Sequence, residues 1–347
     1  MIIKRNLFIL IYFFIYISNG LLAQDLHYTN YNLVKHYFNP AEAASFQGTI
    51  RVGGVYREQF SSFIHKPYSS SLLFLDSPIS YGLNKNHWIG CGMIYYLDQA
   101  GDLALQNNGF IGALSYHIGF DSKFKDVLGF GFQLGSIGRT INPNNAQFEE
   151  QFVSGAKRDL ALITDYKGRY TDYSIGTKYR HKLSLYSNFN VGLAVFHITE
   201  PAIKFNGGKI DNVVHRRINI NASYGIDLSK AVSVIPAIYF SKYTNVTNTM
   251  LQFMMEYRTF KKVESKRQVA KEKFNVQMGL GYRIQDALQF MFMGNYKNWQ
   301  FGFSYDMTVS TAAIYNNYYG GFEIGINRIF NIQKKIKLPP KFYCPRF

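Results

Sequence analysis

Many segments of this chain alternate strictly between apolar and non-apolar residues over about ten positions. In the clearest one, from Ile218 to Leu228, every second residue is apolar and the residues between them are polar or glycine. The segments Phe274–Ile284 and Trp299–Thr308 follow the same rule. Successive side chains of a β-strand point to opposite faces, so the pattern predicts strands with one apolar face and one polar face.

Alternation alone fits either a soluble sandwich, whose apolar faces pack together, or a membrane barrel, whose apolar faces meet lipid. Segment length favours the barrel, because roughly 9 to 11 tilted residues cross a bilayer whereas ordinary strands average about 5 or 6. Aromatic residues also favour it, since the chain has 27 Tyr and 30 Phe and an outer-membrane barrel carries aromatic girdles at headgroup level. Aromatic residues near segment ends are Tyr95, Tyr96, Tyr179, Phe240, Tyr243, Tyr257, Tyr318 and Tyr319.

The N-terminus has the three parts of an export signal. Lys4 and Arg5 precede an apolar stretch from Leu7 to Ile17, and small residues lead to Ala23. We therefore expect residues 1–23 to be a signal peptide that is cleaved after Ala23. The alternative is a retained membrane anchor from Ile2 to Leu22.

The alternating segments predict one domain, an all-β transmembrane antiparallel β-barrel of the bacterial outer membrane with about 14 strands. An even number of strands closes a bacterial barrel and leaves no unpaired edge facing lipid. We expect residues 24–48 to form an N-terminal periplasmic segment, residues 49–330 the barrel and residues 331–347 a basic C-terminal tail. The segments are 49–60, 70–77, 87–98, 109–120, 127–138, 172–183, 188–198, 216–228, 232–243, 249–259, 272–284, 287–297, 299–309 and 319–330.

The connections between segments alternate in length, as long external loops and short periplasmic turns should. Two connections do not fit: the join at 285–286 is short for an external loop, and the charged stretch 261–273 is long for a turn. The longest loop, 140–171, has three open interpretations. It folds into the lumen as a plug, projects outward as a binding surface, or is a mobile solvated loop.

The chain is strongly basic, with a formal net charge of +16. Basic proteins often bind nucleic acid, but an exported barrel meets anionic lipid headgroups and glycolipid phosphates instead. We therefore expect outer-membrane lipid, and no nucleic acid, as the partner of these charges.

No motif in the sequence indicates catalysis, a metal or a cofactor. The eight histidines are dispersed without metal-ligand spacing, and Gly129, Gly131 and Gly135 do not have the dinucleotide-binding spacing. Glycines there are expected to relieve crowding on the inner wall. The chain is thus predicted not to be an enzyme and to need no cofactor. The open alternative is a hydrolase whose active site lies at the barrel rim, with candidates His65, Asp98, Asp102, Asp172 and His215.

Several short motifs resemble the PorP/SprF family of type IX secretion system membrane proteins. The start Gln24-Asp25 and the segment from Tyr37 to Ala41 are similar to the opening of that family, and Tyr56 to Phe60 looks like its aromatic-basic first strand. The run from Ser69 to Pro78 and the closing Tyr-Asp and Gly-x-Glu-Ile patterns also resemble it. The chain departs from the family pattern at Glu42, where a Tyr is usual, and at Phe60, where a Trp is usual.

The resemblance implies a non-enzymatic barrel that works with secretion or gliding machinery in the export or surface anchoring of a partner protein. Partners implied in this way are machinery proteins, a large secreted surface adhesin and a peptidoglycan-linked periplasmic protein. The alternative function is a general diffusion porin or small-solute transporter. Candidate family-motif or partner-contact residues are Asn39, Pro40, Tyr56, Arg57, Gln59, Pro67, Asp76, Tyr305, Asp306 and Glu323.

Each of these residues also has a structural interpretation. Asn39 and Pro40 would form a turn that delivers the chain to the first strand. Tyr56, Arg57 and Asp306 would support the shape of the barrel from the lumen or an interface rather than contact a partner.

Overall fold

The computed structural model describes residues 26–61, 67–80, 83–84, 86–101, 105–121, 124–140, 167–184, 186–205, 210–260, 272–311 and 313–332. The expected signal peptide therefore lies outside the described residues, as do the stretches 141–166 and 261–271 and the tail beyond Ile332. No helix in the described ranges is long and apolar enough to cross a membrane.

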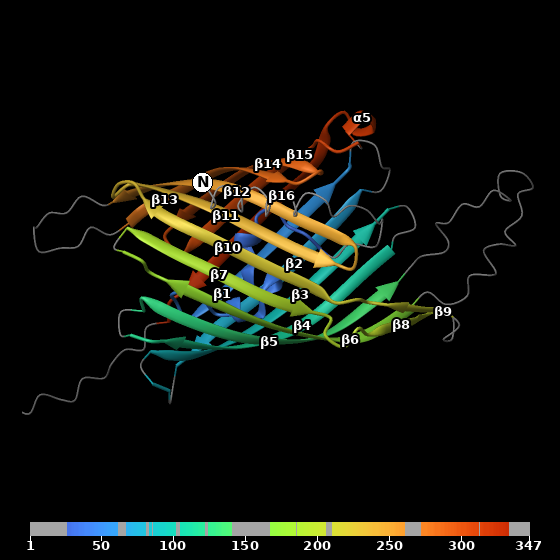
Figure 1. Ribbon diagram of the computed structural model, residues 1–347, viewed down its shortest axis with the longest axis horizontal. Helices are drawn as coiled ribbons and strands as arrows, with labels where there is room; N and C mark the ends of the chain where they lie inside the picture. Colours follow the sequence, from blue (N-terminus) through green and yellow to red (C-terminus); the bar gives the residue numbers. More distant parts are fainter. Residues whose placement is uncertain are drawn as a thin grey trace, which may run out of the picture.

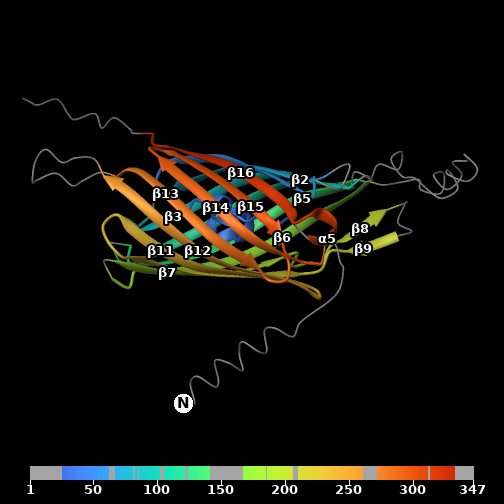
Figure 2. The same cartoon turned by 90° about the horizontal axis from the view of Figure 1, so that it is seen from above.

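Fourteen antiparallel strands close into one barrel (Figures 1 and 2), which confirms the predicted fold class and strand number. The first and last strands pair with each other, so that Tyr56 lies opposite Ile324. The barrel strands are β1 Ile50–Gln59, β2 Tyr68–Ile79, β3 His87–Ala100, β4 Leu105–Gly119, β5 Asp126–Thr140, β6 Lys167–His181, β7 Ser187–Phe196, β10 Arg217–Asp227, β11 Val232–Tyr243, β12 Val246–Phe260, β13 Glu272–Arg283, β14 Ala287–Tyr296, β15 Trp299–Thr308 and β16 Tyr319–Phe330.

Some strands are longer than their alternating segments. Strand β6 begins at Lys167 rather than at Asp172, and β4 begins at Leu105 rather than at Gly109. Main-chain pairing continues past the stretch that alternates, because a ladder needs only backbone partners. Binary patterning therefore underestimates strand length in this barrel.

The two ends of the barrel differ in their connections. One end carries the hairpin of β8 (Ala202–Phe205) and β9 (Ile210–Val213) and the short helix α5 (Ala313–Asn316), as Figure 2 shows. Strand β5 ends and strand β6 begins at this same end, on either side of the longest connection in the sequence. The other end carries the short turns 182–186, 228–231 and 297–298. Longer loops face the cell exterior in barrels of this kind, so we assign the first end to the exterior. The short join after β13 is an external turn in which Gln285 adopts a φ of 61°.

The outer face of the barrel is apolar, as the alternation predicts. The inner face is polar or glycine at many positions, but it also carries buried apolar residues such as Leu72, Phe74 and Ile94, which pack in one cluster with residues of the N-terminal segment. On β13, the outward side chains of Met278 and Leu280 are 55% and 62% exposed, whereas the inward side chains of Asn275 and Arg283 are 6% and 4% exposed. The same division holds for Phe301 and Phe303 against Ser304 and Asp306 on β15.

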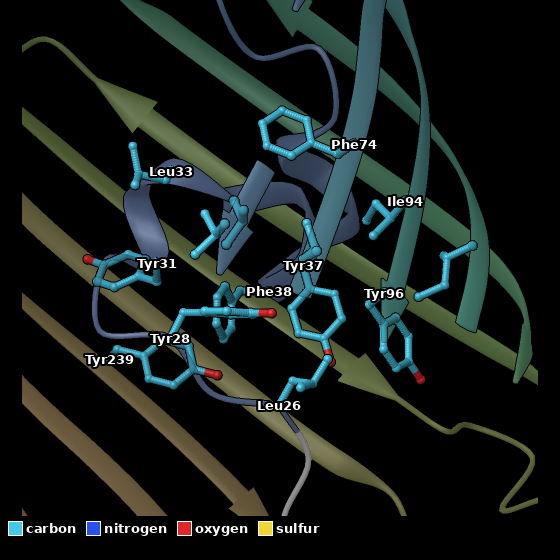
Figure 3. Close-up of a cluster of buried hydrophobic side chains, with 14 of the residues drawn as sticks. Leu26, Tyr28, Tyr31, Leu33, Tyr37, Phe38, Phe74, Ile94, Tyr96 and Tyr239 are labelled. Atoms are coloured by element: carbon cyan, nitrogen blue, oxygen red, sulfur yellow. The ribbon is translucent and has the colours of Figure 1, made fainter. Parts of the chain in front are cut away.

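The N-terminal segment lies inside the barrel, so the expectation of a separate periplasmic segment is wrong for its described residues. Residues 26–48, here called the plug, contain three short helices: η1 (Tyr31–Leu33), α2 (Lys35–Phe38) and η2 (Pro40–Glu42). Figure 3 shows their apolar side chains meeting those of the strands. Most side chains from Tyr28 to Ala44 are buried, so the plug is part of the core of the protein.

The plug crosses the lumen from the external end to the periplasmic end. Leu26 and His27 line a small recess with Arg217 and Tyr243, which stand at the external ends of β10 and β11. At the other end of the plug, Ala44 donates its N–H to Asp76 near the periplasmic end of β2. The chain therefore enters the plug from the cell-surface side.

This direction predicts which plug residues are reachable from outside the cell. In a background without the native cysteines, His27→Cys is expected to react with a membrane-impermeant maleimide on intact cells. The control Gln47→Cys, at the periplasmic end, should react only after the outer membrane is permeabilised. Equal labelling of both variants on intact cells would contradict the assigned direction.

Candidate functional site

The plug folds through local capping and aromatic packing. The side chain of Asn39 accepts a hydrogen bond from Ala41 N at 2.9 Å, with Pro40 at the first helical position, where its missing N–H costs nothing. The rings of Tyr28, Phe38 and Tyr37 meet edge to face at centroid distances of 5.3–6.4 Å. Phe38 also meets Tyr239 of β11 at 5.3 Å, so the aromatic cluster joins the plug to the wall.

Polar side chains of the wall bind the main-chain carbonyls of the plug. Short helices leave many carbonyls without an internal partner, and a buried carbonyl without a partner destabilises the fold. The wall supplies the missing donors from six different strands. The bonds are Gln252 to Thr29 O at 2.9 Å, Asn327 to Leu33 O at 3.0 Å, Gln133 to His36 O at 2.6 Å, Asn219 to Phe38 O at 3.1 Å, Ser115 to Ala43 O at 2.8 Å and Trp88 to Ala44 O at 3.1 Å.

A buried charged cluster, here called the Thr29 cluster, joins the plug to β1, β13, β15 and β16. Arg57 donates to Asp306 at 2.6 Å and to Glu323 at 3.3 Å, and Arg283 donates to Asp306 at 2.9 Å. The hydroxyl of Thr29 donates to Asp306 at 2.7 Å, and the same hydroxyl accepts from Arg57 at 3.1 Å and from Arg283 at 3.0 Å. Arg57 and Arg283 balance the two buried carboxylates of Asp306 and Glu323, and Arg283 also pairs with the exposed Asp286 at 2.8 Å.

Glu323 also holds the main chain of the plug. Its two carboxylate oxygens accept the N–H groups of Thr29 and Asn30 at 2.8 and 2.9 Å. Bonds from N–H groups to a buried carboxylate are stronger than neutral ones. The cluster therefore fixes the external half of the plug to the seam where the first and last strands close the barrel.

Two further ion pairs fix the periplasmic half of the plug. Arg51 binds Asp76 through two bonds of 2.9 and 2.7 Å, and Asp76 also accepts the N–H of Ala44. Lys178 of β6 pairs with Glu42 at 2.8 Å. Burial would raise the pKa of the Glu42 carboxyl, but Lys178 and Lys35 outweigh it and lower that pKa to about 2, so Glu42 is ionised at neutral pH.

Glycines on the inner wall let the plug lie close to the strands. A Cβ on Gly131 would lie 2.2 Å from the backbone of Pro40 and Ala41, and one on Gly176 would lie 2.2 Å from Asn39 Oδ1. At Gly131 this confirms the expectation that a glycine relieves crowding on the inner wall, and the chain that it accommodates is the plug.

The structure brings seven of the ten predicted site residues into contacts between plug and wall: Asn39, Pro40, Arg57, Gln59, Asp76, Asp306 and Glu323. Gln59 is the outermost of these contacts, since it meets the His27 ring of the plug at 3.5 Å at the external mouth.

The other three predicted residues lie elsewhere. Tyr56 and Tyr305 are on the outer face, where Tyr56 donates to Glu58 at 2.8 Å and packs on Phe322. Pro67 precedes β2 in the first external loop.

Sequence reasoning missed Thr29, Glu42, Arg51, Lys178 and Arg283 as members of these contacts. Arg283 stands on the polar side of its alternating segment, which was a usable signal. The plug itself has another signal: between Leu26 and Ala44 the only Lys, Arg, Asp or Glu residues are Lys35 and Glu42, while aromatic residues are frequent. Such a composition suits a buried segment better than a solvated one.

The described candidates of the rim-hydrolase alternative, Asp98, Asp172 and His215, are bonded to different partners. Asp172 pairs with His197 at 2.9 Å, and Ser174 donates to the same carboxylate instead of to the histidine. A nucleophilic serine would need the histidine as its base. Asp98 binds Ser70, and His215 lies near Glu200 at 3.7 Å. His65 and Asp102 lie outside the described residues, and no metal-binding group of three His, Cys, Asp or Glu occurs within them.

The burial of His36 predicts that the protein loses stability in acid. Its ring packs on Phe74 at 4.6 Å, and neither ring nitrogen has a hydrogen-bond partner among the described residues. Burial, with Arg51 adding to it, lowers the pKa of His36 from 6.5 to about 4, although Asp76 and Glu42 act in the opposite direction. The stabilising contribution of neutral His36 is thus complete above pH 6.5 and is lost as the pH falls toward 4.

Between these pH values His36 is protonated in the unfolded state but stays neutral in the folded state. The free energy of unfolding should therefore fall by up to about 3 kcal/mol as the pH is lowered. His36→Leu removes this titration and should flatten that part of the pH profile. Denaturant unfolding at several pH values measures it. An identical pH dependence in wild type and variant would contradict the role of His36.

Solved structures similar to this chain are outer-membrane barrels. The Ralstonia pickettii toluene transporter TbuX matches with a TM-score of 0.51 and 8% identity, over 86% of this chain and 94% of that one. A Pseudomonas aeruginosa FadL homologue matches with a TM-score of 0.48 and 9% identity, over 84% and 93% of the two chains. At 8% identity the likeness to TbuX shows the fold alone. No curated protein matches the chain.

The family comparison covers both the plug and the barrel. The sequence profile described as type IX secretion system membrane protein PorP/SprF matches residues 21–327. This range contains the expected opening motifs, strands β1 to β15 and most of β16. With its apolar outer face and closed sheet, the protein is an outer-membrane barrel, and the chain belongs to the PorP/SprF family of type IX secretion system membrane proteins.

Proposed function

We propose that this barrel serves type IX secretion or gliding machinery in the export or surface anchoring of a partner protein, without catalysis of its own. Its external loops and periplasmic surface contact the partners. These are proteins of the machinery, a large secreted surface adhesin and a peptidoglycan-linked periplasmic protein, within outer-membrane lipid. The family match over residues 21–327 supports the pathway.

The single observation that carries the proposal is the plug. Residues 26–48 fill the middle of the lumen and are bound by side chains of strands all around the barrel. A barrel whose lumen is filled by its own chain offers its loops and rims, rather than its pore, for function.

A diffusion porin or small-solute transporter is the alternative, and conductance separates the two. The purified protein in a planar lipid bilayer is expected to be nearly silent, because the plug occupies the lumen. A stable, open conductance of the unmodified protein would favour the porin. A known open porin, inserted under the same conditions, controls for successful insertion.

Export itself is tested in the native organism. Deletion of the gene should remove one or a few large proteins from the cell surface and leave them in the periplasm, and the intact gene should restore them. Affinity capture of the barrel from native outer membranes should recover the same proteins or components of the machinery. A surface proteome that is identical with and without the gene would overturn the proposal.

A further inference from the structure

A cavity opens at the periplasmic end of the lumen, against the last residues of the plug. Its volume is about 950 Å³, and Ser45 and Phe46 of the plug line it together with residues of β3, β5 to β7 and β10 to β12. It adjoins a smaller recess of about 120 Å³ that reaches up between the plug and β6. The two share Ser45, Lys178, Arg180 and Asn190 in their linings.

The β6 side of this cavity has an excess of positive charge. Lys35, Lys178 and Arg180 line the recess, and its one carboxylate, Glu42, is already paired with Lys178. Lys182 adds a further cation in the larger cavity. Among the described residues, no carboxylate lies within 4.0 Å of the charged nitrogen atoms of Lys35, Arg180 or Lys182.

Several other cations of the lumen are paired with carboxylates. Arg51 pairs with Asp76, and Arg57 pairs with Asp306 and Glu323. On the β10 and β12 side of the cavity, Arg258 lies between Asp227 and Glu256. The positive charge is therefore concentrated on one wall.

Another part of the cavity is apolar. Phe46 of the plug, Trp88 of β3 and Phe124 line it. Trp88 stacks on His117 at 4.5 Å and meets Phe124 at 6.0 Å, so its ring is held in place. A small inorganic anion would use only the charged wall. A ligand that uses both walls has acidic and apolar groups side by side.

We propose that this cavity binds an acidic, amphipathic segment of a periplasmic protein. Its carboxylates bind Lys35, Arg180 and Lys182, and its apolar side chains pack against Phe46 and Trp88. Arginine can bind a carboxylate through two parallel hydrogen bonds, which adds specificity. The inference rests on the proposed function in one respect: it takes the ligand that carries these carboxylates to be a protein.

Trp88 provides a direct signal for the experiment. The chain has 2 Trp, so Trp299→Phe leaves Trp88 as the sole tryptophan. The probe is a short synthetic peptide in which glutamate and leucine alternate, added to the purified full-length barrel in detergent. We expect a saturable change in Trp88 emission that weakens with added salt. The same peptide with lysine in place of glutamate should give no saturable change.

The double variant Arg180→Glu/Lys182→Glu should bind the glutamate peptide about tenfold or more weakly, because two attractive contacts become repulsive. Its control is Lys297→Glu, which changes charge in a turn at the same end of the barrel but outside the cavity. This variant should bind the peptide as the parent does.

Three results would overturn the inference: no saturable signal with the glutamate peptide, equal binding by the double variant, or complete displacement of the peptide by an equal concentration of inorganic phosphate. The last would identify a simple anion site. None of these results bears on export. The proposed function fails instead if the surface proteome is unchanged in the deletion strain, so the two failures are distinguishable.

Discussion

Arg57→Met is expected to lower the free energy of unfolding of the barrel by about 3–5 kcal/mol, which is the typical effect of removing one partner from a buried ion pair. Arg57 is 1% exposed and is the shared donor to Asp306 and Glu323. Methionine fills much of the space but leaves two buried carboxylates with only Arg283 and the plug as partners. Denaturant unfolding in lipid vesicles, followed by tryptophan fluorescence, measures the change.

Two variants separate the contribution of the plug from that of the barrel. Thr29→Val removes the hydroxyl that bonds to Arg57, Arg283 and Asp306 but leaves the ion pairs of the wall intact. It should lower the free energy of unfolding by less than Arg57→Met does, because lost hydrogen bonds destabilise a protein less than an unpaired buried charge. Lys297→Met, at an exposed turn, should change little. A loss below about 1 kcal/mol for Arg57→Met would contradict the role assigned to the Thr29 cluster.

The barrel could be predicted from sequence because each strand carries its own signal. In Phe274–Ile284, every outward residue is apolar and every inward residue is polar or glycine, and pairing with a neighbour requires no further information. The count of fourteen strands followed from such segments. Strand ends such as Lys167–Thr171 could not be predicted, because pairing there continues without an apolar face.

The plug could not be predicted in the same way because its stability comes from residues far away in the sequence. Thr29 is bonded to residues 277 and 294 positions away, Asp306 and Glu323. No local pattern specifies such contacts, and the helices of the plug are too short to be stable alone. The sequence did identify Asn39, Arg57, Asp306 and Glu323 as residues of interest through their resemblance to family motifs. It did not indicate that the motifs meet one another inside the lumen.

Gly131→Leu is expected to displace the plug and open the lumen. A Cβ at this position would lie 2.2 Å from main-chain atoms of Pro40 and Ala41, and main chain cannot move aside as a flexible side chain can. The strand itself should survive, because Gly131 pairs through its backbone with Ser115 and Gly176. An emptied barrel of this strand number encloses water, so bilayer conductance should rise by about tenfold or more over the wild type.

Gly112→Leu is the matched control for this prediction. Gly112 lies on the neighbouring strand β4, and a Cβ there would meet only the carbonyl oxygen of Leu134, at 3.9 Å. Both variants add the same side chain to a barrel glycine, but only Gly131→Leu places it against the plug. Circular dichroism and resistance to unfolding show whether each barrel has formed. A folded Gly131→Leu barrel that stays as silent as wild type would mean that the plug is not what closes this lumen, and the argument for a partner-binding barrel would lose its main support.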